Sequence, residues 1–218
     1  MNLPVKDADC YLCGKPATTS DHIPPRGMFP KPRPNNLVTV PACYDCNNKT
    51  KLDDEYFRLV VAATSGDSPQ SINLAKQRIL PRVSDTPGLM ANFLGNVQWE
   101  DFYSKGGIYL GRQPWCSYER PRIQIIIDKI IRGLFLFHTG QRLPNSFVVD
   151  DFVHNPEFEE ASQRAIVSLP LYRIGDGSVF SYRYGRLNDS CQFETGWFLM
   201  FYDDSSFFVA RTVPRKPD

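Results

Sequence analysis

The stretch CYLCGKPATTSDHIPPRGMFPKPRPNNLVTVPACYDCNNKTK, Cys10–Lys51, decides how the N-terminal part of this chain folds. It holds two Cys-x-x-Cys pairs, Cys10/Cys13 and Cys43/Cys46, and prolines recur between them. Such a segment cannot form long helices, and it has too few apolar residues for a core of its own. Four thiolates that close a tetrahedral structural zinc site are the expected staple, with chance spacing of free cysteines as the alternative.

Local patterns predict two short strands and a helix within this stretch. Thr18–Ile23 and Leu37–Val40 read as strands, and Pro41 should end the second of them. Beyond the second cysteine pair, apolar residues recur with a helical period to about Ala63.

Polar residues suited to hydrolytic chemistry lie among the cysteines. Asp21 and His22 end the first predicted strand, and Asn47 follows the last cysteine. Histidine titrates near neutrality, as a general base should, and a carboxylate with an amide oxygen suits a magnesium-type ion. Neighbouring residues of a strand point to opposite faces, so Asp21 and His22 cannot both face one site in a regular strand. We therefore expect a bend or bulge there, favoured by Pro24-Pro25.

Taken in order, the motifs Cys-x-x-Cys, Asp-His-Ile-x-Pro, Asn-Leu and Cys-x-x-Cys-Asn-x-Lys resemble the HNH endonucleases of the zinc-stapled ββα-metal type. The arrangement is most similar to that of a phage Holliday-junction resolvase, in which asparagine also follows the last cysteine. The resemblance covers residues 10 to about 57. It implies a treble-clef-like fold and hydrolysis of DNA phosphodiester bonds, with an RNase as a narrower alternative.

Carried over position by position, the resemblance implies a role for each motif residue. His22 would be the general base that activates water, and Asp21 and Asn47 would hold one catalytic divalent ion. Asn36 would brace the loop that orients His22. The structural zinc would be bound by Cys10, Cys13, Cys43 and Cys46. The nucleic acid would be contacted by Lys49, Lys51 and Arg26, although the two lysines could equally well solvate a helix face.

Asn47 stands where the name-giving pattern has histidine. An oxygen ligand in place of imidazole favours Mg²⁺ or Mn²⁺ over Zn²⁺ or Ni²⁺ at the catalytic position. Asn48 is a rival for the same role, and Asn47 is preferred only because it directly follows Cys46.

Composition sets limits on location and partners. The 218 residues are 42% hydrophobic and 22% charged, as in ordinary soluble globular proteins. A net charge of +1 provides no global basic field, so a surface for DNA or RNA must be local. No apolar run approaches the roughly 20 residues of a membrane span, and the N-terminus lacks the apolar segment of a signal peptide. We therefore expect a cytoplasmic protein without a membrane partner, in which cysteines are metal ligands or free thiols.

The remainder of the chain predicts helices and an antiparallel sheet. A helix is expected at Ser71–Leu80, a hairpin turns at Gly106-Gly107, and an apolar helix follows Pro121 and ends near Gly140. Four strands are expected at Ile166–Ile174, Val179–Leu187, Cys191–Tyr202 and Phe207–Val213. Basic and aromatic residues are interleaved between 105 and 142, either as a grip on nucleic acid or as an ordinary core with a solvated face.

The expected fold class is α+β. Residues 1–66 would form a small zinc-stabilised ββα-metal nuclease domain, and 67–84 a helical linker. Residues 85–218 would form an α+β domain whose antiparallel sheet packs on the apolar helix and binds the substrate, a protein partner or a second copy of the chain. The rival function is a non-catalytic zinc module that binds nucleic acid or protein.

Overall fold

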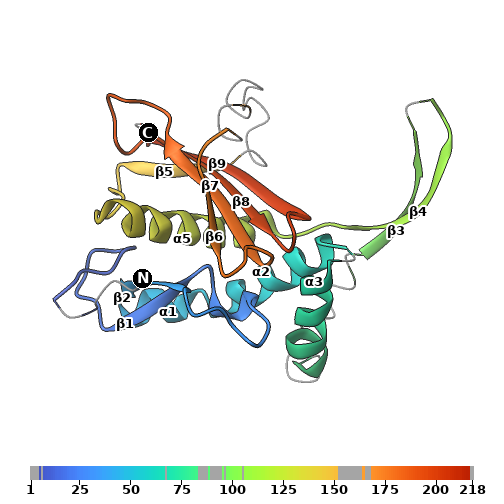
Figure 1. Ribbon diagram of the computed structural model, residues 1–218, viewed down its shortest axis with the longest axis horizontal. Helices are drawn as coiled ribbons and strands as arrows, with labels where there is room; N and C mark the ends of the chain where they lie inside the picture. Colours follow the sequence, from blue (N-terminus) through green and yellow to red (C-terminus); the bar gives the residue numbers. More distant parts are fainter. Residues whose placement is uncertain are drawn as a thin grey trace.

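Helices and antiparallel sheets make up the protein, as expected for an α+β chain (Figure 1). The computed structural model describes residues 5, 7–66, 68–82, 88, 95, 97–104, 106–151, 164 and 168–216. Among the helices of these segments, none has both the length and the apolar content needed to cross a membrane.

The N-terminal part contains two paired strands and two short consecutive helices. Strand β1 (Thr19–Ile23) pairs antiparallel with β2 (Val38–Ala42), and a 3₁₀ turn (Arg26–Met28) lies in the loop between them. Both predicted strands are confirmed, but the prediction that Pro41 ends the second is wrong. Proline lacks a donor yet keeps its acceptor, and the Pro41 carbonyl accepts a hydrogen bond from the Tyr11 N–H at 3.0 Å.

The single helix expected after the cysteines is divided in two. Helix α1 (Tyr44–Lys49) is separated from α2 (Lys51–Thr64) by Thr50, whose φ and ψ of −97° and 7° leave the helical range. Helix α3 (Pro69–Leu74) continues as a π-helical turn (Ala75–Ile79) and a 3₁₀ turn (Leu80–Arg82), close to the helix expected there.

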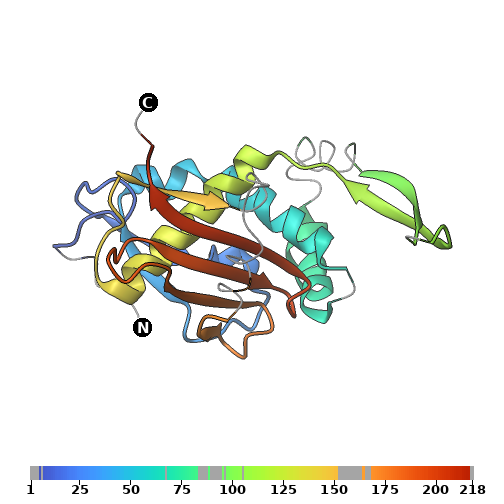
Figure 2. The ribbon, with the colours of Figure 1, turned by 90° about the horizontal axis from the view of Figure 1, so that it is seen from above.

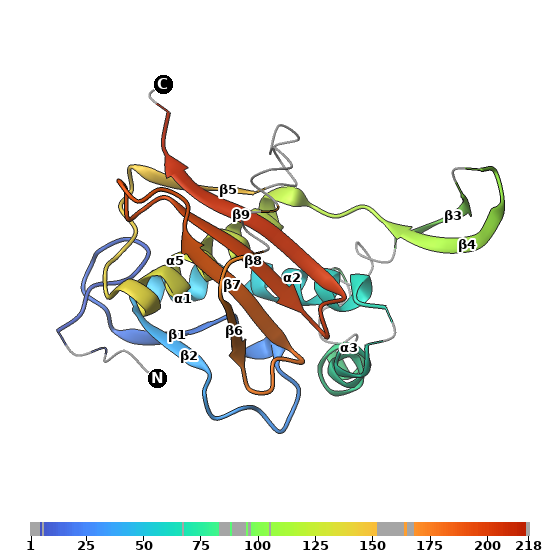
Figure 3. The ribbon, with the colours of Figure 1, turned by 45° about the horizontal axis from the view of Figure 1, so that its top comes forward.

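The predicted hairpin is present as β3 (Val97–Tyr103) and β4 (Tyr109–Cys116). It extends away from the rest of the molecule in all three ribbon views (Figures 1 to 3). Its turn needs Gly107, which has a φ of 82°.

A five-stranded antiparallel sheet forms the C-terminal part (Figure 2). In sheet order its strands are β5 (Phe147–Asp151), β9 (Ser206–Pro214), β8 (Thr195–Phe201), β7 (Phe180–Arg186) and β6 (Leu171–Ile174). Three of the predicted strands are confirmed within a few residues. The strand predicted at Ile166–Ile174 is shorter than predicted, and residues 166–167 of that prediction lie outside the described segments. Strand β5 was not predicted, because its sequence FVVDD is short and ends in two aspartates.

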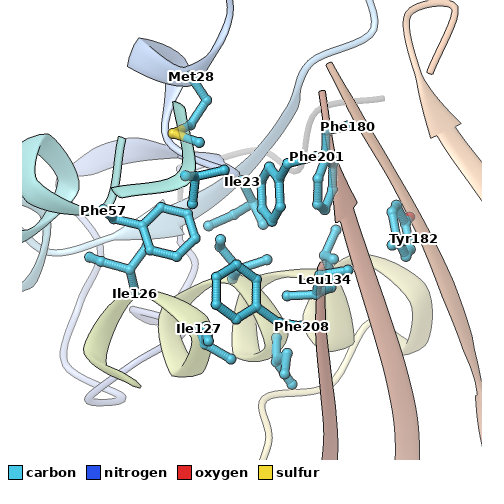
Figure 4. Packing of buried hydrophobic residues seen from close by; sticks show 14 of the residues in the cluster. Ile23, Met28, Phe57, Ile126, Ile127, Leu134, Phe180, Tyr182, Phe201 and Phe208 are labelled. Carbon is cyan, nitrogen blue, oxygen red and sulfur yellow. The ribbon is translucent and has the colours of Figure 1, made fainter. Parts of the chain in front are cut away.

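Helix α5 (Arg120–Thr139) lies between this sheet and the N-terminal elements (Figures 1 and 3). Its predicted apolar stripe is buried, and Gly140 ends it with a φ of 69°. One continuous core joins both parts of the chain, with Ile23 and Phe57 from the N-terminal part packed near Ile126, Phe201 and Phe208 (Figure 4). The predicted division at residues 66 and 85 therefore runs through shared packing, and it stays a prediction.

The contact of α5 with β1 depends on a glycine. A Cβ atom placed on Gly133 would lie 2.5 Å from Cγ1 of Ile23, so only glycine lets the strand approach this closely. Ile23 directly follows Asp21 and His22 in β1. Its close packing on α5 therefore fixes how far the end of β1 that carries these two residues lies from the helix.

Most basic residues of the 105–142 stretch that the structure describes are engaged within the protein. Arg122 forms an ion pair with Asp53, Arg132 with Asp128, and Lys129 with Asp54. Internal ion pairs therefore account for much of a pattern that could have indicated a grip on nucleic acid.

Candidate metal centre and active-site pocket

The four motif cysteines lie together at one end of the β1–β2 pair. Their Sγ atoms are all within 4.8 Å of one another, and Cys13 Sγ and Cys43 Sγ are 3.7 Å apart. A tetrahedral zinc ion with Zn–S bonds of about 2.3 Å requires sulfurs separated by about 3.8 Å. The cluster could therefore hold a metal ion such as zinc, with all four positions filled by protein.

Local turns bring these sulfurs to one point. Cys10 accepts a hydrogen bond at its carbonyl from the Gly14 N–H, and Gly14 has the φ of 74° that this tight turn requires. Cys43 caps α1, because its Sγ accepts a hydrogen bond from the Cys46 N–H at 3.4 Å. Burial raises the pKa of Cys10 and Cys46, whereas a hydrogen bond from the Lys15 N–H lowers the pKa of Cys13 to about 7. Binding a metal must therefore displace protons from the thiols of Cys10 and Cys46.

Most of the predicted catalytic residues meet in a pocket of about 330 Å³ beside this cluster. Its lining includes Asp21, His22 and Asn47, together with Arg26 and Lys51. Residues that are distant or unremarkable in the sequence complete the wall: Ser20, Pro25, Gly27, Asp54, Glu55 and Arg58.

Asp21 and His22 share this pocket without the expected strand irregularity. β1 pairs with β2 in regular register, with Asp21 opposite Val40 and His22 opposite Thr39, so no bulge or bend lies at these two residues, and the chain bends at Pro24, just after the strand. β1 pairs with a strand on one side only, and the pocket is also lined by α1 and α2, which follow β2 in the chain. Side chains from both faces of an edge strand can reach a pocket that lies along its end.

Asn47 is held by its amide nitrogen. Nδ2 donates to Thr19 Oγ1 at 3.1 Å and to the Ser20 carbonyl at 3.3 Å. This arrangement leaves the oxygen Oδ1 as the atom available to a ligand. Asn48, the rival in the sequence, donates to the Tyr44 carbonyl of its own helix and is not part of the pocket lining.

Asp21 is buried and already has two partners. Its Oδ2 accepts a hydrogen bond from the Tyr11 hydroxyl at 2.9 Å and lies 3.2 Å from the Lys129 ammonium. The same ammonium is 3.2 Å from both oxygens of Asp54 and 3.1 Å from Thr50 Oγ1. Lys129 therefore connects α5 to two carboxylates of the pocket lining.

The pKa values of Asp54 and His22, which line the pocket with Asp21, are shifted in the directions that burial dictates. Burial raises the pKa of Asp54 to about 6, although the Lys129 charge opposes the shift. Burial, with a smaller effect from the Arg26 charge, lowers the pKa of His22. The His22 imidazole is therefore neutral at pH 7 and can accept a proton.

Arg58 lines the pocket, and its guanidinium packs against the backbone of Gly27. A Cβ atom on Gly27 would lie 2.5 Å from Nη1 of Arg58, so the guanidinium occupies the space that a side chain would fill. Glu55 lies 3.9 Å from the same guanidinium. A guanidinium can recognise a phosphate through paired hydrogen bonds.

The remaining predicted residues are distributed unevenly. Lys51 and Arg26 are exposed at the pocket, whereas Lys49 is exposed on α1 and does not line it. Asn36 is not part of the pocket lining, and its Oδ1 accepts a hydrogen bond from the Gly175 N–H at 2.8 Å, in the turn between β6 and β7. The structure thus ties this asparagine to the C-terminal sheet.

No family model, curated protein or solved structure matches this chain.

Sequence reasoning missed Lys129, Asp54 and Arg58 as residues of the site. One signal was present for Lys129, which interrupts the apolar pattern of α5 between Ile127 and Ile130. A lysine inside a buried stripe needs a carboxylate partner, but the pattern does not say which one.

Proposed function

We propose that the protein is a metal-dependent HNH-type endonuclease that hydrolyses DNA phosphodiester bonds. The observation that carries this proposal is the pocket that Asp21, His22 and Asn47 line together, next to a four-cysteine cluster. In this interpretation β1, β2 and α1 form a zinc-stapled ββα-metal unit of treble-clef type. The order of its motifs supports this assignment, because zinc, base and metal ligands then come from one short segment.

The chemistry assigned to the residues follows from their surroundings. The neutral His22 imidazole takes a proton from water, whose oxygen attacks phosphorus. One P–O bond forms, another breaks, and the leaving oxygen takes up a proton from solvent. Asp21, through Oδ1 rather than the Oδ2 that contacts Tyr11 and Lys129, and Asn47 Oδ1 would hold Mg²⁺ or Mn²⁺. When bound, this ion neutralises charge that develops on the phosphate.

Positive side chains around the pocket would hold the substrate strand. Lys51 and Arg26 are exposed at its rim, and Arg58 reaches its wall beside Gly27. These three cations line the same pocket as the predicted base. Their placement suits a phosphate whose charge must be compensated before a nucleophile can approach.

The decisive test is cleavage by matched variants. His22→Ala and Asn47→Ala should each reduce cleavage with Mg²⁺ or Mn²⁺ by at least about a hundredfold, as expected for a lost base or metal ligand. Asn48→Ala removes the same side chain one position along and should stay within about twofold, because Asn48 is turned away from the pocket. Zinc content of all three should match the parent protein, and only Asn47→Ala, which loses two hydrogen bonds to β1, should lower the unfolding free energy, by about 1–2 kcal/mol.

The substrates should include branched, nicked, single-stranded and duplex DNA, with RNA alongside. Cleavage of DNA that His22→Ala retains in full would refute the assignment. Cleavage of RNA alone would replace DNA by RNA as the substrate while keeping the same residues.

A non-catalytic zinc module that binds nucleic acid or protein is the second candidate. The observation that favours it is the neutralisation of Asp21 by the Lys129 ammonium, since a carboxylate already paired with a cation is a weaker metal ligand. Titration with Mn²⁺, followed by its paramagnetic signal, separates the candidates. The endonuclease predicts a second metal site that Asn47→Ala weakens, and the binding module predicts none.

A further inference from the structure

A larger pocket, of about 430 Å³, lies outside the candidate active site. Three segments that are far apart in the sequence line it: the proline-rich loop 29–34, helix α3 and the turn between β6 and β7. Its apolar wall includes the buried side chains Phe29, Ile174 and Val179. Two cationic side chains, Lys31 and Arg33, come from the loop.

The walls of this pocket are fixed to one another. The Lys31 backbone is held on both sides by Gln77, whose Oε1 accepts from the Lys31 N–H at 2.7 Å and whose Nε2 donates to the Lys31 carbonyl at 3.0 Å. The Asn36 bond to the Gly175 N–H joins the other end of the loop to the sheet. Gly175 has a φ of 68°, and a Cβ atom there would lie 3.0 Å from Pro34. The pocket is therefore preorganised by three distant parts of the chain.

Arg33 is the group that lacks a partner. Its Nε is buried and has no hydrogen-bond acceptor in the described part of the chain. Buried donors are normally satisfied, and because this Nε is not exposed to the pocket, a ligand there would bind the terminal nitrogens of the guanidinium. The planar guanidinium is shaped for two parallel hydrogen bonds to a phosphate or carboxylate.

Asp176 does not supply that acceptor. Its Oδ1 accepts hydrogen bonds from the Ser178 N–H at 2.9 Å and from the Ser178 hydroxyl at 2.7 Å. The carboxylate is thus engaged within its own turn, while it still contributes one negative charge to the pocket wall.

We propose that this pocket binds a phosphate group, with the Arg33 guanidinium as its main ligand and Lys31 as the second positive charge. The phosphate comes either from a nucleic-acid strand or from a free nucleotide. A nucleic-acid strand is favoured because the two pockets adjoin along one loop. Arg26 and Gly27 line the candidate active site, and Phe29 of the same loop lines the larger pocket. The binding step needs no cleavage, and it can therefore fail or succeed independently of the proposed function.

The test measures phosphate binding to the zinc-loaded full chain by calorimetry, without added Mg²⁺ or Mn²⁺. The ligands are inorganic phosphate, thymidine monophosphate and a short oligothymidylate with a hydroxyl at each end. Tightest binding of the oligonucleotide identifies a strand phosphate as the source, and equal or tighter binding of the mononucleotide identifies a free nucleotide.

Two charge changes at the pocket should act in opposite directions. Arg33→Gln should weaken binding about tenfold or more, because it removes the bidentate donor. Asp176→Asn should strengthen binding severalfold, because it removes from the pocket wall a negative charge that repels the phosphate. Arg186→Gln, the same charge change at an exposed position of β7 outside both pockets, should leave the affinity unchanged.

Arg33→Lys keeps the charge, and its affinity should lie between those of the parent and Arg33→Gln. This variant and Asp176→Asn keep the proposal testable if Arg33→Gln fails to fold. The proposal is overturned if no ligand binds at millimolar concentration, or if the folded Arg33 and Asp176 variants bind like the parent protein.

Discussion

Replacing Lys129 by methionine tests how α5 supports the candidate site. The ammonium is almost fully buried, with 2% of the side chain exposed, and it contacts Asp21 and Asp54 at 3.2 Å and Thr50 at 3.1 Å. Methionine keeps most of the length and apolar contact of the side chain but removes its charge. Asp21 and Asp54, whose side chains are 7% and 21% exposed, would then face each other without a cation.

The expected loss of unfolding free energy is about 3 kcal/mol. Removing one partner of a buried ion pair costs roughly 3–5 kcal/mol, because the other charge stays buried without compensation. The lower end applies here, since Asp54 retains some solvent and its pKa of about 6 lets it take up a proton when Lys129 is gone. Replacing Asp54 by asparagine in the Lys129→Met background should restore about 1–2 kcal/mol.

Urea unfolding of the zinc-loaded protein, followed by circular dichroism, measures these differences. Arg122→Met is the matched control, because Arg122 also joins α5 to α2 through Asp53, but its side chain is 22% exposed and should cost only about 1 kcal/mol. A loss below about 1 kcal/mol for Lys129→Met, or no recovery in the double variant, would refute the argument that this ion pair stabilises the site.

Three further changes test other parts of the structure. Gly27→Ala should displace the Arg58 guanidinium and reduce cleavage about tenfold while unfolding changes little, as kcat/KM would report. Burial lowers the pKa of His138 from 6.5 to about 4. Between these pH values the unfolded chain binds a proton at His138 and the folded chain does not, so the unfolding free energy falls as the pH drops below 6.5. His138→Phe should remove about 1.5 kcal/mol of that fall between pH 6.5 and 4, after allowance for partial exposure, in unfolding measured across this range. Cys13→Ser should lose the bound zinc and much of the N-terminal fold, whereas Cys191→Ser, outside the cluster, should keep one zinc per chain by elemental analysis.

Local sequence patterns were sufficient for much of the fold. The apolar period of α5 and its terminal Gly140 predicted a buried helix that the structure contains. The two strands around the proline-rich loop and the cluster of four cysteines were also predictable. In each case the physical cause lies within a few residues, as a period, a cap or a ligand spacing.

The errors have equally local causes. Pro41 lies inside β2, because a proline carbonyl can still accept a hydrogen bond at that position. No bulge separates Asp21 from His22, because the pocket lies at the end of an edge strand that both faces can reach. The rules that hold for strands in the middle of a sheet therefore predicted a strand end at Pro41 and a bulge at Asp21-His22, and edge strands do not require either.

What the sequence by itself determined is the set of side chains that could bind metal and accept a proton. Only the tertiary structure decided how they are connected: Asn47 lies in the pocket and Asn48 outside it, Asn36 accepts a hydrogen bond from the turn between β6 and β7, and Lys129 pairs with Asp21. The physical reason is the distance along the chain. Lys129 lies on α5, more than a hundred residues after Asp21 in the sequence, yet its ammonium contacts the Asp21 carboxylate. No local period or spacing in the sequence encodes such a contact.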